Sequence, residues 1–146
     1  MWKRWIGTNA DLGLLTIRVG LGLAFLMHGT PKLMGGPAAW VQTGGAMGNL
    51  GIHFAPGLWG LLAAVSEAGG ALCLLSGVLF RPALLGLIST MSVATVMHLE
   101  AGEGFGGASH AMEVGIVFIG LWVTGPGRYR VPLPGLSRVA TLPARS

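Results

Sequence analysis

Charge is scarce in this sequence: Asp, Glu, Lys and Arg make up 10% of the 146 residues. A soluble domain typically carries about 25%, and the mean hydropathy of this chain is +0.69. The composition therefore excludes an ordinary soluble domain and predicts an integral membrane protein. At this length the chain is expected to form one small bundle rather than two domains.

Cysteine and the usual cofactor signatures are scarce as well. Cys73 is the only cysteine, so no disulfide can form within the chain and the redox compartment cannot be inferred from cysteines. The sequence has neither a C-x-x-C-H motif nor a G-x-G-x-x-G motif after a strand, which mark attached haem and dinucleotide binding. The basic residues do not gather in a patch, which argues against a nucleic-acid partner.

Four apolar runs dominate what is present, at residues 12–27, 57–79, 83–98 and 110–124. We expect each run to cross the membrane as a helix. The predicted fold is thus an all-α, four-helix transmembrane bundle over residues 1–130, followed by a basic, Pro-containing tail over 131–146. Residues 29–56 form a polar connection in which Pro31 disfavours an uninterrupted helix and residues 38–47 are predicted to form a short interfacial helix.

The distribution of basic residues predicts the orientation of this bundle. Four spans place both termini on one side of the membrane, and only Lys32 falls in the opposite loops. The basic residues on the terminal side are Lys3, Arg4, Arg81, Arg128, Arg130, Arg138 and Arg145. The positive-inside rule then places both termini in the cytoplasm, and we expect a multi-pass protein of a bacterial or archaeal cytoplasmic (inner) membrane.

The second run contains a single charge, Glu67, near its middle. A carboxyl in hydrocarbon is costly unless it is paired or neutralised. Its helical face consists of small residues, which allow a neighbouring helix to approach closely; these are Gly60, Ala63, Ala64, Gly70 and Ala71. Glu67 is therefore either a structural polar clamp or a carboxyl that handles protons or binds a ligand.

Arg18 interrupts the first run. Counted from the ends of their spans, Arg18 and Glu67 differ in depth by only a few ångströms. A charge-assisted pair would resolve both burial costs, so we expect the two to meet. Their role is either structural or catalytic, through a shared proton or a quinone oxygen.

His28 and His98 end the first and third runs on the outer side, with Lys32 close to His28. One interpretation is hydrogen bonding to a quinone carbonyl with proton exchange at the histidines. A second is ligation of a b-type haem by both histidines, and a third is contact with lipid headgroups only.

His110 and Glu113 share one face of the fourth helix and are further cofactor-binding candidates. We assign no metal to them. A di-iron carboxylate bundle needs Glu-x-x-His on two helices, and here the reversed order occurs once.

Taken in order, these signals resemble the DoxX family. The matching positions are Arg18, His28, Gly29, Lys32, residues 67–70 and 74–77, Arg81, and residues 91–98, 104–106 and 125–128. The resemblance spans residues 11–130 and implies a four-helix membrane bundle. Some members of the family are subunits of thiosulfate:quinone oxidoreductase, and others associate with redox enzymes.

We therefore expect a quinone-associated subunit of a membrane oxidoreductase, with a redox-enzyme partner subunit and with Glu67 and Arg18 as its catalytic candidates. The alternatives are a haem-binding electron carrier that uses His28 and His98, and a non-catalytic scaffold or small-molecule carrier. Faces of small residues are also compatible with a homo-oligomer within the lipid bilayer.

Overall fold

The computed structural model describes residues 2–132, with the backbone alone for residues 2–8. Every regular element in this part is helical: α1 (Trp2–Met34), α2 (Gly36–Gly44), the 3-10 helix η1 (Gly45–Leu50), α3 (Pro56–Ser76), α4 (Phe80–Glu100) and α5 (Gly104–Thr124). Four helices are long and apolar enough to cross a membrane, namely Asn9–Met34 within α1 and the whole of α3, α4 and α5. The predicted all-α, four-helix membrane fold is thus confirmed. Residues 133–146 of the predicted tail lie outside the described residues.

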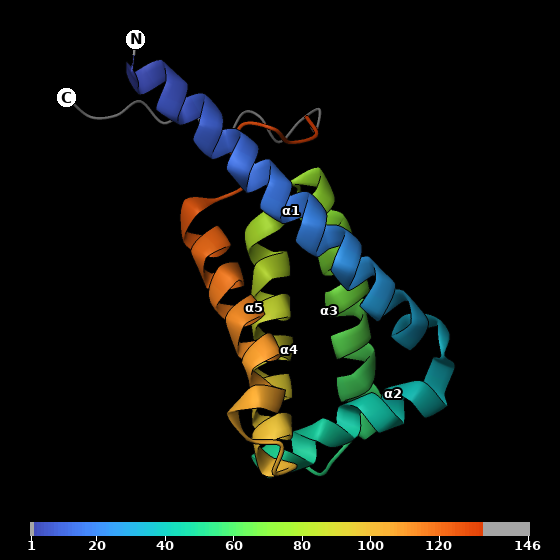
Figure 1. The fold of residues 1–146 in the computed structure, drawn as a ribbon. Coiled ribbons are helices and arrows are strands. Elements are labelled where there is room, and N and C mark those ends of the chain that lie inside the picture. Colours follow the sequence, from blue (N-terminus) through green and yellow to red (C-terminus); the bar gives the residue numbers. More distant parts are fainter. Residues whose placement is uncertain (1, 133–146) are drawn as a thin grey trace, which may run out of the picture.

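Three of the spans, α3, α4 and α5, stand side by side, and α1 crosses them obliquely (Figure 1). The rings of Phe25 on α1 and Phe118 on α5 meet edge to face with centroids 5.0 Å apart. Leucines from α3, α4 and α5 complete this core, namely Leu74, Leu84, Leu87 and Leu121. All four spans therefore share one apolar centre, and most of their remaining surface faces outward.

Close glycine contacts determine how α1 lies on α3. A Cβ atom added at Gly22 would lie 2.7 Å from Cγ of Leu75, and one added at Gly29 would lie 2.5 Å from the amide nitrogen of Ala68. As the residue number rises on α1 it falls on α3, so the two helices run antiparallel. Because glycine has no Cβ, the backbone of α1 can approach α3 at the level of Ala68.

Helix α1 extends further than the sequence predicts, because it continues through Pro31 to Met34. Proline removes one backbone donor. In a membrane the neighbouring helical hydrogen bonds have no water to replace them. Keeping the helix intact around one lost bond therefore costs less than opening the segment. The helix ends where the amide of Gly35 donates to the carbonyl oxygen of Pro31 at 2.9 Å.

The connection after α1 is helical and packs tightly across one end of α3. The helix predicted at residues 38–47 exists as α2 followed by η1, with different boundaries, and its position at the membrane interface stays a prediction. A Cβ atom at Gly60 would lie 1.7 Å from the carbonyl oxygen of Trp40, and one at Gly44 would lie 1.8 Å from that of Pro56. This packing closes what we call the distal end of the bundle, where α4 ends and α5 begins.

The opposite end, which we call the terminal end, joins the start of the transmembrane part of α1 to the segment after α5. The amide of Arg128 donates to Oδ1 of Asp11 at 3.0 Å, and the amide of Val131 donates to the carbonyl oxygen of Ser76 at 2.8 Å. The start of the first span and the end of the last span therefore lie at the same end of the bundle, as an even number of spans requires. That this end faces the cytoplasm remains a prediction. Of the basic residues on which it depends, Arg138 and Arg145 lie outside the described residues, as do the side chains of Lys3 and Arg4.

Candidate functional site

Glu67 is the buried acidic residue of the bundle, with 2% of its surface exposed. It lies on α3 with buried small residues on either side, among them Ala64, Ala68 and Ala71. Gly29 of α1 packs directly against it, since a Cβ atom there would lie 2.8 Å from Cβ of Glu67. The small-residue face therefore does bring a second helix onto the carboxyl, as the sequence indicates.

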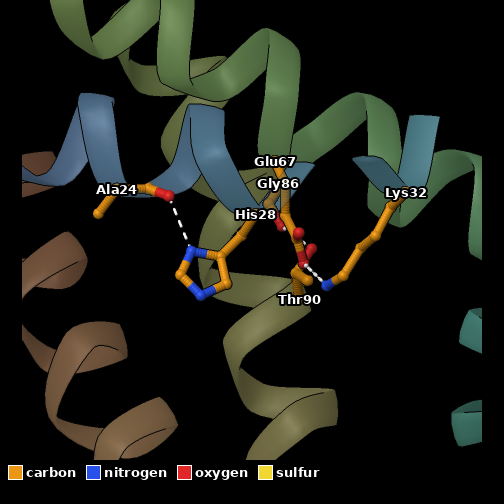
Figure 2. Close-up of polar contacts among 6 residues, drawn as sticks. All are labelled: Ala24, His28, Lys32, Glu67, Gly86 and Thr90. Atoms are coloured by element: carbon orange, nitrogen blue, oxygen red, sulfur yellow. Dashed lines mark hydrogen bonds and ion pairs between the residues drawn. The ribbon is translucent and has the colours of Figure 1, made fainter. Parts of the chain in front are cut away.

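The partner of Glu67 is Lys32. Nζ of Lys32 donates to Oε1 of Glu67 at 2.8 Å, and the side chain of Lys32 is 38% exposed. Figure 2 shows the two side chains pointing toward each other from α1 and α3. The indole of Trp40 on α2 donates to the carbonyl oxygen of Lys32 at 3.1 Å, which ties the end of α1 to α2. An ammonium at this distance stabilises the carboxylate by Coulomb attraction.

Only one carboxylate oxygen of Glu67 is satisfied. Among the residues that the structure describes, Oε2 is buried and has no hydrogen-bond partner. A buried polar atom without a partner is uncommon in a folded protein and requires an explanation, such as a bound water, an ion or a ligand. This oxygen is the feature of the site that a purely structural ion pair leaves unexplained.

The predicted contact between Arg18 and Glu67 is wrong. Arg18 is fully buried at the terminal end of α3, where Nε donates to the carbonyl oxygen of Leu74 at 2.8 Å and Nη2 to that of Leu75 at 3.2 Å. Its Nη1 donates to the carbonyl oxygens of Pro126, at 2.7 Å, and Tyr129. Arg18 thus satisfies the open carbonyls of α3 and of the segment after α5, where a cation is favoured by the helix dipole.

The depth estimate failed because α1 is longer than its apolar run and crosses α3 obliquely (Figure 1). Leu74 and Leu75 follow Glu67 by seven and eight residues, which places Arg18 roughly 11 Å from the carboxyl along the helix axis. Gly77 confirms this register, because a Cβ atom there would lie 2.7 Å from Nη2 of Arg18. Arg18 therefore belongs to the terminal end, and Lys32 reaches Glu67 from the other end of α1.

His28 lies beside the ion pair, one helical turn before Lys32 (Figure 2). It is exposed, and its Nδ1 is 2.8 Å from the carbonyl oxygen of Ala24 on its own helix. The bond to Ala24 turns the imidazole toward the terminal end. His28 and Lys32 therefore form one exposed face of α1 next to the buried carboxyl, and this part of the predicted site is assembled.

His98 does not join this site. His28 is followed by Gly29, which packs against Ala68 of α3. The residues of α4 at about the same height in the bundle are Gly86 and Leu87. His98 follows Leu87 by eleven residues, roughly 16 Å further along α4. Its Nδ1 is 2.8 Å from Oε2 of Glu103, while His28 turns the other way. Two imidazoles placed so cannot reach one iron, so this pair does not fit a bis-histidine haem.

His110 and Glu113 lie on α5 near the distal end, and both are exposed. Glu103, the residue before α5, pairs with His98 and not with His110 or Glu113. Among the described residues, no group of three or more His, Cys, Asp and Glu side chains could hold a metal ion. These residues therefore stay separate from the site around Glu67.

Thr90 is a neighbour of the site that the sequence pattern did not reveal. It lies on α4, its hydroxyl donates to the carbonyl oxygen of Gly86 at 2.9 Å, and Figure 2 draws it beside Glu67. Gly86 packs against Ser66, the residue before Glu67, with a distance of 2.9 Å from an added Cβ to Oγ of Ser66. A lone threonine in an apolar helix carries no signal of its own, so only the packing of α4 on α3 identifies it.

A separate cavity of about 280 Å³ lies between α4 and α5, lined by apolar side chains that include Met91 and Met112. The hydroxyls of Ser92 and Thr95 in its wall donate to carbonyls of their own helix at 2.9 and 2.8 Å. The cavity therefore presents an apolar lining. It faces away from Gly86 and Thr90, so it is distinct from the site at Glu67.

Comparison with known proteins gives one result. A family model described as DoxX matches residues 13–99, which is more than half of the chain and runs from within α1 to the penultimate residue of α4. The match contains Arg18, His28, Lys32 and Glu67. No curated protein and no solved structure matches the chain, so the family model alone carries the relationship.

Proposed function

The chain belongs to the DoxX family of membrane proteins, and from this premise we propose that it is a quinone-associated subunit of a membrane oxidoreductase. The head-group site in this proposal is formed by Glu67, Lys32 and His28. The supporting observation is the buried Oε2 of Glu67, which has no hydrogen-bond partner among residues 9–132. An intramembrane carboxyl of this kind is by default a functional group.

The donors and acceptors of the site fit a quinone head group. One N–H of Lys32 donates to Oε1 of Glu67. An ammonium has three N–H donors, so Lys32 retains others for a carbonyl oxygen of the ligand. The exposed imidazole of His28 lies one turn away and offers its second ring nitrogen as a hydrogen-bonding group. Glu67 lies next to them and offers Oε2 as a hydrogen-bond acceptor. When bound, the quinone would supply the two-electron chemistry, and a partner subunit or a small reductant would exchange the electrons with it.

Arg18 has a positioning role in this proposal. Its guanidinium holds the middle of α1 to the C-terminal end of α3 through carbonyl oxygens and so fixes the register that brings Lys32 to Glu67. The non-catalytic scaffold is the second candidate, since an ion pair between α1 and α3 also stabilises a bundle. It is favoured by the same Arg18 contacts, and it leaves Oε2 of Glu67 unexplained. Haem is not proposed, because His28 and His98 do not meet.

Binding to purified protein in lipid nanodiscs tests the proposal. We expect the wild type to bind a short-chain benzoquinone or its quinol, and Lys32→Met to bind it about 10- to 100-fold more weakly, the factor for one charge-assisted hydrogen bond. Glu100→Gln, which alters an exposed carboxylate at the end of α4, should bind like the wild type. If the wild type binds neither redox form, the proposal fails and the scaffold remains.

A further inference from the structure

The unsatisfied atom of the site specifies the chemistry of its ligand. Oε2 of Glu67 is buried, and no described residue donates a hydrogen bond to it. A carboxylate oxygen only accepts hydrogen bonds. Lys32 and Glu67 form an ion pair in this structure, with Nζ 2.8 Å from Oε1, and both oxygens of a paired carboxylate are acceptors. The missing partner is therefore a donor.

None of the neighbouring side chains donates to Oε2 among the described residues. Lys32 donates to Oε1, and the Thr90 hydroxyl donates to the carbonyl oxygen of Gly86 at 2.9 Å. Nδ1 of His28 lies 2.8 Å from the carbonyl oxygen of Ala24. These contacts leave Oε2 of Glu67 as an acceptor that no described residue supplies with a donor.

We propose that this site binds the reduced, dihydroxy form of its ligand, the quinol, more tightly than the oxidised quinone. The inference rests on the proposed function and adds the redox state that the site prefers. One hydroxyl of the quinol donates to Oε2 of Glu67. Lys32 serves both forms alike, because its remaining N–H groups bind a hydroxyl or a carbonyl oxygen. A quinone has only hydrogen-bond acceptors. Its carbonyl oxygen would face the carboxylate oxygen without a hydrogen between them, and the two would repel each other.

Replacing the acceptor by a donor reverses this preference. In Glu67→Gln the amide oxygen can accept from Lys32, which places the NH₂ group where Oε2 lies in the wild type. The variant then offers a donor to the ligand, so it favours the carbonyl of the quinone. The two proteins differ by one functional group of nearly equal size, which makes the variant a direct test of the hydrogen-bond direction.

The experiment is isothermal titration calorimetry of the nanodisc-embedded protein with a short-chain quinone, the matching quinol kept reduced under argon, and the dimethyl ether of that quinol. For the wild type we expect the quinol to bind about 10- to 100-fold more tightly than the quinone, as a hydrogen bond to a charged group predicts. The ether, which lacks the hydroxyl donors, should bind no better than the quinone. Glu67→Gln should favour the quinone, and Glu100→Gln should keep the wild-type order.

The wild-type comparison of quinol, quinone and ether needs no variant, so the test survives if Glu67→Gln folds poorly. Equal affinity for quinol and quinone would mean that water occupies the acceptor, and a preference for quinone would mean that Glu67 is protonated. Either result overturns the inference and leaves the proposed function standing. Binding of neither form to the wild type would instead overturn the proposed function itself.

Discussion

At the scale of single residues, the two members of the Lys32–Glu67 pair differ in their access to the surface. Glu67 is 2% exposed, and the side chain of Lys32 is 38% exposed. A lysine can extend its ammonium along its flexible stem to a wetter region when its partner is lost. A buried glutamate has no such alternative, so loss of Lys32 leaves the more costly orphan.

This asymmetry gives a prediction for stability. Lys32→Met should lower the stability of the bundle by about 3–5 kcal/mol, the range for a buried charge deprived of its partner, and Glu67→Gln by less. The double variant should be milder than the sum of the two, because no orphan charge remains. The measurement is a double-mutant cycle on the apparent midpoint of thermal unfolding in detergent.

A cycle between Arg18→Met and Glu67→Gln serves as the control. The two side chains lie roughly 11 Å apart along α3 and share no partner, so their effects should add within the usual error of such cycles. Clear coupling between Arg18 and Glu67, together with additivity between Lys32 and Glu67, would contradict the ion pair described above.

At the scale of elements, the site depends on how closely α1 approaches α3. The approach occurs at Gly29, where an added Cβ would lie 2.5 Å from the amide nitrogen of Ala68 and 2.8 Å from Cβ of Glu67. Backbone atoms cannot move aside as a flexible side chain can. Any larger residue at this position must therefore push the end of α1, with Lys32, away from Glu67.

We predict that Gly29→Ala destabilises the bundle by about 1–3 kcal/mol, the usual cost of overpacking, and weakens quinol binding along with it. Gly20→Ala is the matched control on the same helix, because an added Cβ there meets nothing within 4 Å. Alanine also favours a helix over glycine, so this control should be neutral or slightly stabilising. Thermal unfolding and calorimetry on both variants measure the two effects. Equal behaviour of the two variants would mean that close packing at Gly29 is not what positions Lys32.

At the scale of the whole molecule, the chain has a terminal end rich in basic residues and a distal end closed by α2 and η1. Arg81 lies in the first turn of α4 at the terminal end, with its guanidinium 5.9 Å from the centre of the Trp122 ring. Arginine and tryptophan together are typical of a membrane interface. The predicted orientation of the protein in the membrane depends on the basic residues of this end.

We expect the terminal end to lie in the cytoplasm. Single cysteines at Ser146 and Gly106, in a background without Cys73, would be treated with an impermeant thiol reagent in intact cells. Labelling is expected at position 106, in the first turns of α5, and not at 146. The reverse pattern would invert the topology and turn the distal end, with His98 and His110, toward the cytoplasm.

The sequence alone determined the class of protein, the number of spans and the identity of the buried charges. Hydropathy and helix length are local quantities, so four spans follow from composition along the chain. That Glu67 is buried and approached by another helix follows from its small-residue face, because such a face is a property of one helix.

Only the tertiary structure decided which charges meet. Depth counted along each span assumes upright helices that start and stop with their apolar runs, whereas α1 continues through Pro31 to Met34 and crosses α3 obliquely. With this geometry Arg18 lies at the carbonyls at the end of α3 and Lys32 contacts Glu67. His28 and His98 lie apart. Pairing between helices depends on their tilt and register, and these are set by close contacts such as that of Gly29 with Ala68. Such contacts join segments that are far apart in the chain. They therefore produce no periodic pattern in the sequence of either helix.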